Sequence, residues 1–363
     1  MNLTRRDLGK LALAAGAASK LMAAKPNSVF GGVQVGTITY SFRSMPSSAE
    51  ETLKYCVDCG ISGIELMSNV AEGYAGIPAG RGGGPGGPGG PGGPGGAGRA
   101  PGGAPGGAPG ATPGAAPGGA PGQARGARAP LTPEQQAAQQ KAADDTKKAR
   151  LAVPMSKYKA FRTMYEDAGV KIYAFKLPPT MTMSDEEYEY IWNVGETLGA
   201  NHITMELPTD DALLQRVGEY ATKRKLRIAF HTHGAGGDSG FDRALNGSKF
   251  TALNFDAGHY YGVNGKSPVP VIQKYHDRIA SLHLKDRKGP DAAGTPGGSA
   301  PGGGGPNMPW GQGETPLKDI LQLMKKDKYT FPASIEYEYN TPEGSDAVSE
   351  VKKCVQYCKA ALA

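Results

Sequence analysis

Side chains able to bind a metal or move a proton recur at the ends of the predicted β-strands. Four of the six histidines lie in such places, with carboxylates and a lysine beside them. The positions are Glu65, Glu206, His231, His233, Asp256, His259, His283, Lys285, Asp286, Glu336 and Glu338. A mixed set of imidazoles and carboxylates that converges on one point suits a divalent ion such as Mn²⁺, Zn²⁺, Co²⁺ or Mg²⁺. The residue types therefore predict a metal site.

Side chains alternate between the two faces of a β-strand, and this pairs several of these residues on one face. Residues two positions apart lie on the same face of a strand. His231 and His233 thus share a face, as do His283 and Lys285, and Glu336 and Glu338. Three predicted strands therefore each present a pair of polar groups to one side.

Eight strands, near residues 35, 65, 173, 204, 229, 253, 281 and 335, must position these groups. A helix or a helical stretch is predicted after each strand, and this alternation is typical of a parallel sheet. The first strand is predicted over residues 33–42, and Tyr40-Ser41-Phe42-Arg43 lies where a glycine-rich phosphate fingerprint would belong, so a dinucleotide-binding fold loses support. We expect an α/β fold, a (β/α)8 TIM barrel, with its site at the carboxyl ends of the strands.

Two low-complexity segments interrupt this pattern. Residues 76–130 and 287–307 are rich in glycine and proline and hold too few apolar side chains to offset the entropy of ordering them. The pieces 31–75, 131–286 and 308–363 together have 257 residues, close to the roughly 250 of a TIM barrel. The sequence predicts one barrel domain over residues 31–363, with both segments as insertions on the active-site side.

The N-terminus has the features of an export signal. Arg5 and Arg6 precede an apolar run from Leu11 to Ala15 and then small residues. This order is typical of a signal peptide, and the paired arginines resemble a twin-arginine signal. The run is too short for a membrane span. We expect residues 1–30 to be a signal peptide and the protein to be exported, with a periplasmic location.

The charge distribution argues against nucleic acid as a partner. The net charge is +6, but residues 1–25 and 76–130 each carry a net charge of +4, which leaves about −2 for the remainder. A barrel without a basic stripe lacks the electrostatic surface that nucleic acids need. The four cysteines form two pairs at helical spacing with no further zinc ligands, so we expect buried structural thiols.

Four short runs resemble a known family. They are Asp256-x-Gly258-His259, His283-Leu284-Lys285-Asp286, Trp310-Gly311-x-Gly313 and Ile335-Glu336-Tyr337. In their order and spacing they resemble the xylose isomerase-like TIM-barrel superfamily of sugar phosphate isomerases and epimerases. The resemblance implies metal ligation by Glu, Asp, His and Glu from the fifth to eighth strands. Asp256, His283 and Glu336 match the last three.

The fifth strand departs from the family pattern, because it offers His231 where the family has Glu. Glu206, at the end of the fourth strand, could supply the missing carboxylate. We expect Glu206 as a metal ligand, with His231 either as a further ligand or directly behind the ligands.

The resemblance also implies a mechanism. The metal would chelate adjacent oxygens of a hydroxy-carbonyl substrate and acidify the C–H bond between them. Glu336 or Glu206 would be the base, and Lys285 would stabilise the oxyanion. Glu65, His233 and His259 would contact the substrate.

These features predict a metal-dependent isomerase or epimerase of a small sugar or sugar derivative. Two alternatives stay open: a lyase or hydrolase that uses the same chemistry on oxidised (keto) glycosides, and a non-catalytic sugar-binding protein. An apurinic endonuclease is disfavoured by the few histidines and the acidic core. The sequence is compatible with a homo-oligomer and does not fix the substrate or the metal.

Overall fold

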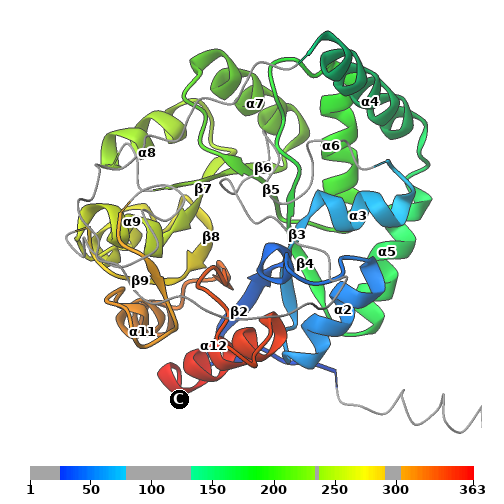
Figure 1. Cartoon of the computed structure of the whole chain (residues 1–363). Coiled ribbons are helices and arrows are strands. Elements are labelled where there is room, and N and C mark those ends of the chain that lie inside the picture. Colours follow the sequence, from blue (N-terminus) through cyan, green and yellow to red (C-terminus); the bar gives the residue numbers. More distant parts are fainter. Residues whose placement is uncertain (1–24, 79–131, 234–236, 291–303) are drawn as a thin grey trace, which may run out of the picture.

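Eight parallel strands close into a barrel in the computed structural model, which describes residues 25–78, 132–233, 237–290 and 304–363. Strand β11 pairs with both β8 and β2 and so completes the ring (Figure 1). The predicted (β/α)8 TIM barrel is therefore confirmed. The barrel strands are β2 (Val33–Ile38), β3 (Gly63–Met67), β4 (Lys171–Lys176), β5 (His202–Glu206), β6 (Arg227–His231), β7 (Thr251–Asp256), β8 (Ile279–Leu284) and β11 (Ala333–Ile335).

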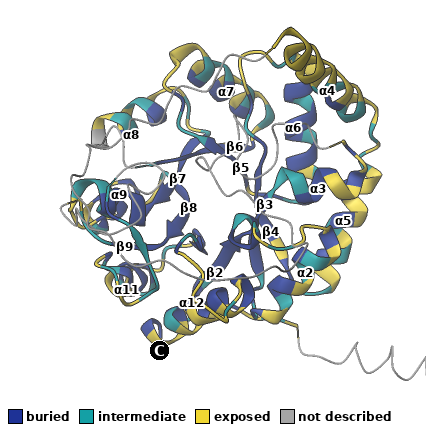
Figure 2. Cartoon of the chain, viewed as in Figure 1, coloured by how far each residue is buried: buried dark blue, intermediate teal, exposed yellow. Residues whose placement is uncertain are grey.

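Helices surround the barrel, and most pack an apolar face inward, whereas α4 (Pro133–Ala152) is exposed along most of its length. Figure 2 shows the strands as almost wholly buried, whereas the helices are exposed on their outer sides. The described helices are α2 (Ala49–Asp58), α3 (Ser68–Ala75), α4 (Pro133–Ala152), α5 (Ser156–Asp167), α6 (Asp185–Leu198), α7 (Asp211–Arg224), α8 (Gly237–Asn246), α9 (Ala257–Asn264), α10 (Val269–Tyr275), α11 (Leu317–Asp327) and α12 (Ala347–Ala361).

Local sequence signals set several helix ends. Ser48 caps α2 and forms a reciprocal capping box with Glu51. Thr132 caps α4 in the same way, and Pro133 takes the first helical position. These pairs satisfy backbone N–H groups that have no partner inside the helix. Gly199 ends α6 in the left-handed conformation that glycine adopts without a steric penalty.

Three elements at the mouth differ from the sequence prediction. The first strand ends at Ile38, and Thr39–Phe42 forms a 3₁₀ turn (η1). The last strand ends at Ile335, so that Glu336 follows it directly. Helix α9 was not predicted, because its eight residues are too few to show a helical period. It begins where the Asp256 side chain accepts a hydrogen bond from the backbone N–H of His259.

The folded chain begins before residue 31, the predicted start of the barrel. Strand β1 (Val29–Phe30) pairs antiparallel with β2, and the buried Ser28 hydroxyl donates to the Val35 carbonyl at 2.6 Å. Residues 1–24, which hold the predicted signal motif, lie outside the described residues. None of the described helices is long and apolar enough to cross a membrane.

Both predicted insertions have ends that pack on the barrel. Residues 79–131 and 291–303 lie outside the described residues. Beside the first gap, Arg150 on α4 forms a two-armed ion pair with Glu72 on α3, at 2.7 and 3.0 Å. Beside the second, β9 (Asp286–Arg287) pairs with β10 (Asn307–Met308), and Arg287 is fully buried. The four cysteines are free and buried, as expected.

Candidate metal centre at the barrel mouth

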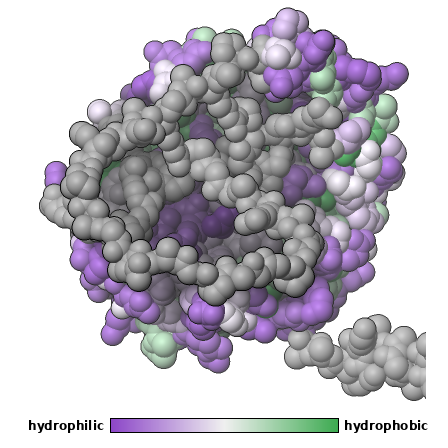
Figure 3. Space-filling view, viewed as in Figure 1, coloured by the Kyte–Doolittle hydropathy of each residue, from purple (hydrophilic) through white to green (hydrophobic). Residues whose placement is uncertain are grey.

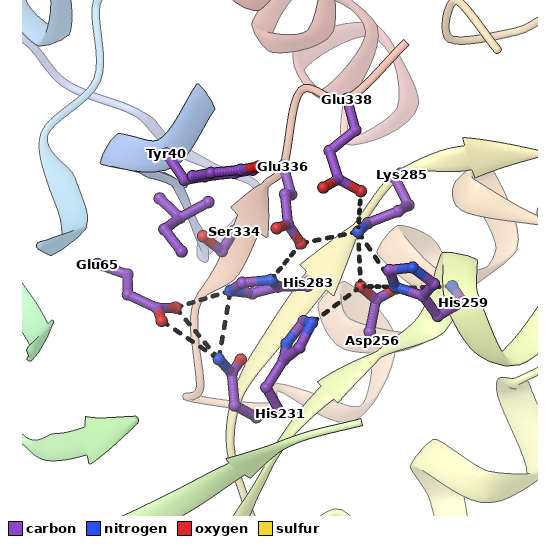
Figure 4. Close-up of polar contacts among 12 residues, drawn as sticks. Tyr40, Glu65, His231, Asp256, His259, His283, Lys285, Ser334, Glu336 and Glu338 are labelled. Atoms are coloured by element: carbon purple, nitrogen blue, oxygen red, sulfur yellow. Dashed lines mark hydrogen bonds and ion pairs between the residues drawn. The ribbon is translucent and has the colours of Figure 1, made fainter. Parts of the chain in front are cut away.

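Four residues from adjacent strands bring their ligand atoms together at the carboxyl end of the barrel. They are His231 at the end of β6, Asp256 at the end of β7, His283 on β8 and Glu336 after β11. One atom of each lies within 4.8 Å of the others, and all four side chains are buried (Figure 4). Strand ends meet here because parallel strands of a barrel present the same terminus to one side.

This donor set fits a divalent cation. Two imidazoles and two carboxylates are a mixed nitrogen–oxygen set that first-row divalent metals accept, and the two carboxylates balance the charge of such an ion. The Nε2 atom of His231 faces this group, 3.6 Å from Asp256 Oδ2, and burial holds the pKa of the imidazole well below its usual range. A neutral imidazole is the form that binds a metal.

Carboxylates outnumber ammonium groups around this centre. Among the described residues at the mouth, five carboxylates face two lysines: Glu65, Glu206, Asp256, Glu336 and Glu338 against Lys176 and Lys285. Burying unpaired charge is costly, so a site of this composition attracts a cation. The electrostatics therefore agree with the donor chemistry.

The contacts of Glu336, Asp256 and His283 determine the pKa values of these side chains. Burial alone would raise the pKa of Glu336, but Lys285 and His283 hold it well below its usual range. The pKa of Asp256 is likewise low, since His259 and Lys285 outweigh its burial. Burial would lower the pKa of His283, yet Glu336 and Glu65 raise it to about 10. His283 would therefore have to lose a proton to bind a metal.

Lys285 lies among three carboxylates. Its Nζ atom is 3.0 Å from Asp256 Oδ2, 2.9 Å from Glu336 Oε2 and 2.6 Å from Glu338 Oε2. The side chain is buried, and these three charges raise its pKa against the effect of burial. We predicted that Lys285 stabilises a substrate oxyanion, but the structure shows it bound to these carboxylates and beneath the cavity surface.

Glu65 was expected to contact substrate, and the structure places it behind the metal centre. Its carboxylate is fully buried and accepts a hydrogen bond from His283 Nε2 at 2.7 Å (Figure 4). It also accepts from Thr204 at 2.6 Å. Burial would raise the pKa of Glu65, but the charge and hydrogen bond of His283 lower it to about 2. The group is thus an anion held beneath His283.

Glu206 was expected as a metal ligand, but the structure places it outside the four-residue group. Its carboxylate is 2.9 Å from Lys176 Nζ and 3.2 Å from His233 Nε2. His231, at the end of the next strand, lies within the four-residue group instead. Glu206 and His233 line the cavity beside the centre.

A second group of imidazoles adjoins the first. His231, His233 and His259 also bring one ring nitrogen each within 4.8 Å of one another. The rings of His233 and His259 stack with their centroids 4.6 Å apart, and His259 Nδ1 is 2.7 Å from Asp256 Oδ2. His259 therefore stands where a substrate above the centre would meet it.

The centre opens into a small hollow lined mostly by polar side chains. In Figure 3 hydrophilic side chains gather in the hollowed middle of this face. The lining is Ile38, Tyr40, Met67, Lys176, Glu206, His231, His233, His259, Glu336 and Glu338. A few apolar groups on one side face charged groups on the other.

Sequence reasoning missed Lys176 and Tyr40 and placed Glu338 on the rim. Lys176 ends β4, so the rule that found Glu206 and His231 would also have found it. Tyr40 follows the first strand in η1, where the predicted strand continued. Glu338 lies two residues after Glu336, on the same side, and contacts Lys285.

Comparison with known proteins bears on this centre. Residues 208–358 match the xylose isomerase-like TIM barrel family. That stretch contains all four residues of the candidate centre, from His231 to Glu336. The fold and the family resemblance expected from the sequence are thus supported over the half of the barrel that holds the site.

Curated relatives match a shorter stretch. The inosose dehydratases of Clostridium botulinum and Salmonella typhimurium are 32% and 35% identical over 78 residues, which is 20% of this chain. The match spans only about a quarter, 26%, of the length of each relative. A solved structure of a probable 3-DHS dehydratase from Bacillus anthracis superposes with a TM-score of 0.54 at 13% identity. It covers 89% of this chain and 97% of its own, and it shows the shared fold.

Proposed function

We propose that this chain is a metal-dependent enzyme that removes a proton from the carbon next to the carbonyl group of a small sugar or sugar derivative. By returning a proton, it isomerises or epimerises that substrate. The observation that carries the proposal is the convergence of His231, Asp256, His283 and Glu336 beneath a small polar cavity. Such a cavity with convergent polar groups is the usual setting of a small-molecule active site.

The four residues would hold one divalent ion. Bound there, the ion would supply positive charge that acidifies a C–H bond beside a carbonyl and stabilises the negative charge left when the proton departs. The proposal needs this charge, since an isolated carboxylate is a weak base toward carbon. Mn²⁺, Zn²⁺, Co²⁺ and Mg²⁺ are the candidates.

Glu336 is the proposed base. Its carboxylate lines the cavity and is kept ionised by Lys285 and His283, so it can accept a proton from a substrate above it. Glu206 lines the opposite part of the cavity beside Lys176 and His233. It is the proposed partner that returns a proton. Return to the former carbonyl carbon, with the hydroxyl proton passing to the former carbonyl oxygen, would isomerise the sugar. Return to the other face of the same carbon would epimerise it.

The cavity lining suits a small carbohydrate. A sugar has hydroxyl groups around its edge and apolar C–H groups on its faces. Here Lys176, Glu206 and His259 offer hydrogen bonds, and Tyr40 and Met67 offer apolar contact.

Elimination of water from a keto sugar or keto polyol is the second candidate. It is favoured by the match to inosose dehydratases and by His231, which replaces the carboxylate of the family pattern. With His231 in place, Glu336 and Asp256 are the only carboxylates of the four ligands. Elimination needs one base and one acid for the leaving hydroxyl, whereas epimerisation needs proton transfer on both faces of a carbon.

Deuterium exchange tests the common step. The full chain is loaded with Mn²⁺ or Co²⁺ in D₂O and offered inososes, ketoses and 3-ketoglycosides, and the products are followed by NMR. We expect deuterium at the carbon next to the carbonyl. Isomers or epimers would support the first candidate, and dehydrated products would support the second. Glu336→Gln should slow exchange by about 100- to 10,000-fold, while Glu350→Gln, a buried glutamate of α12, should not. Substrate binding without any exchange would indicate a sugar-binding protein instead.

We also propose that the chain is exported, on the basis of Arg5, Arg6 and the apolar run that follows them. Expression of the full chain and of an Arg5→Lys/Arg6→Lys variant, followed by cell fractionation, tests this. The full chain should reach the periplasm and the variant should stay in the cytoplasm; equal distribution of the two would contradict the proposal.

A further inference from the structure

A chain of buried hydrogen bonds crosses the barrel interior below the metal centre. His202 on β5 contacts Ser281 on β8, with Nε2 3.0 Å from the hydroxyl oxygen. The Ser281 hydroxyl donates to the Asn254 Oδ1 atom at 2.9 Å. The Asn254 amide nitrogen lies 3.2 Å from Glu65 Oε2. Glu65 completes the chain with its contact to His283.

The donors and acceptors along this chain can be assigned. Asn254 Oδ1 accepts from Ser281, so the other end of the Asn254 amide is its NH₂ group, which donates to Glu65. Thr204 donates to the other carboxylate oxygen. Glu65 therefore receives every hydrogen bond it makes here, which is the arrangement that an ionised carboxylate requires.

His283 is the third donor to Glu65. The Asn254 amide nitrogen also lies 3.3 Å from His283 Nε2, but it donates to Glu65. Since an ionised carboxylate only accepts, the much shorter contact of 2.7 Å between Nε2 and Glu65 places the proton on Nε2. The other nitrogen, Nδ1, is directed at Glu336, 2.6 Å from its Oε2 atom. Nδ1 is thus the nitrogen that faces the remaining members of the four-residue group (Figure 4).

From this geometry we infer that Glu65 is a positioning residue. It holds the proton of His283 on Nε2 and fixes the ring, so that Nδ1 is the atom offered to a metal. This inference rests on the metal centre of the proposed function, and it assigns Glu65 a part in metal affinity rather than in substrate contact. A carboxylate behind a histidine ligand is a recognised means of orienting the ring and raising its basicity.

The position of Glu65 in the barrel supports this assignment. It comes from β3, on the far side of the barrel from His283 on β8, and reaches across the interior. Its side chain has no exposed surface and does not line the cavity. A carboxylate so enclosed acts on the substrate only through the residue that it holds.

Co²⁺ affinity tests the inference. The full chain, Glu65→Gln and Glu350→Gln are titrated with Co²⁺, with the affinity measured by competition with a chelator and the site followed by its visible absorption. A glutamine amide has one oxygen that accepts and one NH₂ group that donates. In Glu65→Gln the NH₂ group must therefore face one of the three donors Thr204, Asn254 and His283. We expect Co²⁺ binding to weaken by about 10- to 100-fold and the absorption spectrum to change. Glu350→Gln, which alters a buried and hydrogen-bonded glutamate far from the centre, should leave both unchanged.

The outcomes separate this inference from the proposed function. If the natural chain binds no Co²⁺, Mn²⁺ or Zn²⁺, the proposed function fails. If it binds Co²⁺ and folded Glu65→Gln binds equally well with the same spectrum, the inference alone is overturned.

A second measurement needs no variant and applies if Glu65→Gln does not fold. The natural chain, labelled with ¹⁵N in histidine and loaded with Zn²⁺, is examined by long-range ¹H–¹⁵N NMR. The inference requires His283 to keep its proton on Nε2 and to bind through Nδ1. A proton on Nδ1 with the metal at Nε2 would overturn it.

Discussion

At the scale of single residues, Lys285 offsets much of the negative charge at the barrel mouth. It contacts Asp256, which is fully buried, and Glu336 and Glu338, which are only slightly exposed to the cavity. The Lys285→Met variant keeps most of the side-chain volume and removes the charge. We expect the metal-free variant to lose about 3 kcal/mol or more of unfolding free energy, as when one partner of a buried pair is removed.

Added metal should offset part of that loss. A divalent ion at the centre would balance the carboxylates that Lys285 no longer neutralises. Urea unfolding with and without Mn²⁺ measures the effect, and Lys288→Met, at a half-exposed ion pair with Glu314, is the control. A Lys285→Met variant as stable as the natural chain without metal would contradict this charge balance.

His202 makes the unfolding free energy depend on pH, and the direction of that dependence follows from its pKa. Burial lowers the pKa of this imidazole to about 4, from its usual 6.5. The unfolded chain therefore binds a proton below pH 6.5 that the folded chain does not bind until about pH 4. Above pH 6.5 the contribution of His202 to the unfolding free energy does not change with pH. As the pH falls from 6.5 to about 4, protonation of His202 in the unfolded chain lowers the unfolding free energy by about 3 kcal/mol.

The His202→Gln variant isolates this effect, since its amide can still donate to Ser281. The difference in unfolding free energy between the two proteins, measured by urea unfolding from pH 7.5 to about pH 4, should shift in favour of the variant as the pH falls. If the unfolding free energies of the natural chain and the variant change with pH in parallel, His202 does not contribute in this way.

The sequence could identify most of the candidate centre, but not the direction of its side chains. Asp256, His283 and Glu336 lie at predicted strand ends and match the ligand pattern of the family that the sequence resembles. Glu206 and His231 end neighbouring strands and are equivalent by that rule. Only the structure shows that Lys176 and His233 draw the Glu206 carboxylate aside. The position of Glu65 behind His283 could not be predicted for a similar reason, because its partners Thr204, Asn254 and His283 come from three other strands.

At the scale of elements, the short helix α9 and strand β8 pack closely at Gly258. A Cβ atom added to Gly258 would lie 2.2 Å from Lys285 Cγ and 2.5 Å from the Lys285 carbonyl oxygen. Gly258→Ala should therefore reduce the unfolding free energy by about 1–3 kcal/mol. It should also weaken metal binding, since α9 carries Asp256 at its N-terminus and His259 in its first turn.

Gly73 in α3 provides the matched control. An added Cβ atom there meets no atom within 4 Å. Gly73→Ala should be neutral or stabilise the helix by up to about 1 kcal/mol. Calorimetry of both variants and a metal titration check the comparison. Equal effects of the two substitutions on unfolding free energy and metal affinity would show that the close packing at Gly258 does not determine either quantity.

Regular elements were predictable where their period and end signals agree. The capping boxes of α2 and α4 and the terminal glycine of α6 are legible in the sequence. Short elements were not, because α9 and η1 have too few residues for a period to emerge. Those two elements lie at the mouth, so the prediction was weakest at the site itself.

At the scale of the whole molecule, the centre is built by the second half of the chain. All four candidate ligands lie between His231 and Glu336, whereas the first low-complexity insertion lies between β3 and α4. The Glu72–Arg150 ion pair ties the helices on either side of it. Replacing residues 79–131 with a shorter Gly/Ser linker should leave metal affinity and unfolding free energy unchanged, because loops tolerate changes in length at small entropic cost.

Metal titration and urea unfolding of the shortened chain test that expectation. The Arg150→Met variant of the full chain is the comparison, since it should lower the unfolding free energy without altering metal affinity. A loss of metal affinity in the shortened chain would show that the insertion contributes to the site.

The metal content of the purified full chain tests the central claim most directly. It is measured by elemental analysis after incubation with Mn²⁺, Co²⁺ or Zn²⁺ and removal of free metal, beside the Asp256→Ala and His283→Ala variants. The account predicts about one divalent ion per chain, with the ion lost in both variants while their circular dichroism remains native. A natural chain that retains none of these metals, or variants that retain as much as the natural chain, would contradict a metal centre at the barrel mouth.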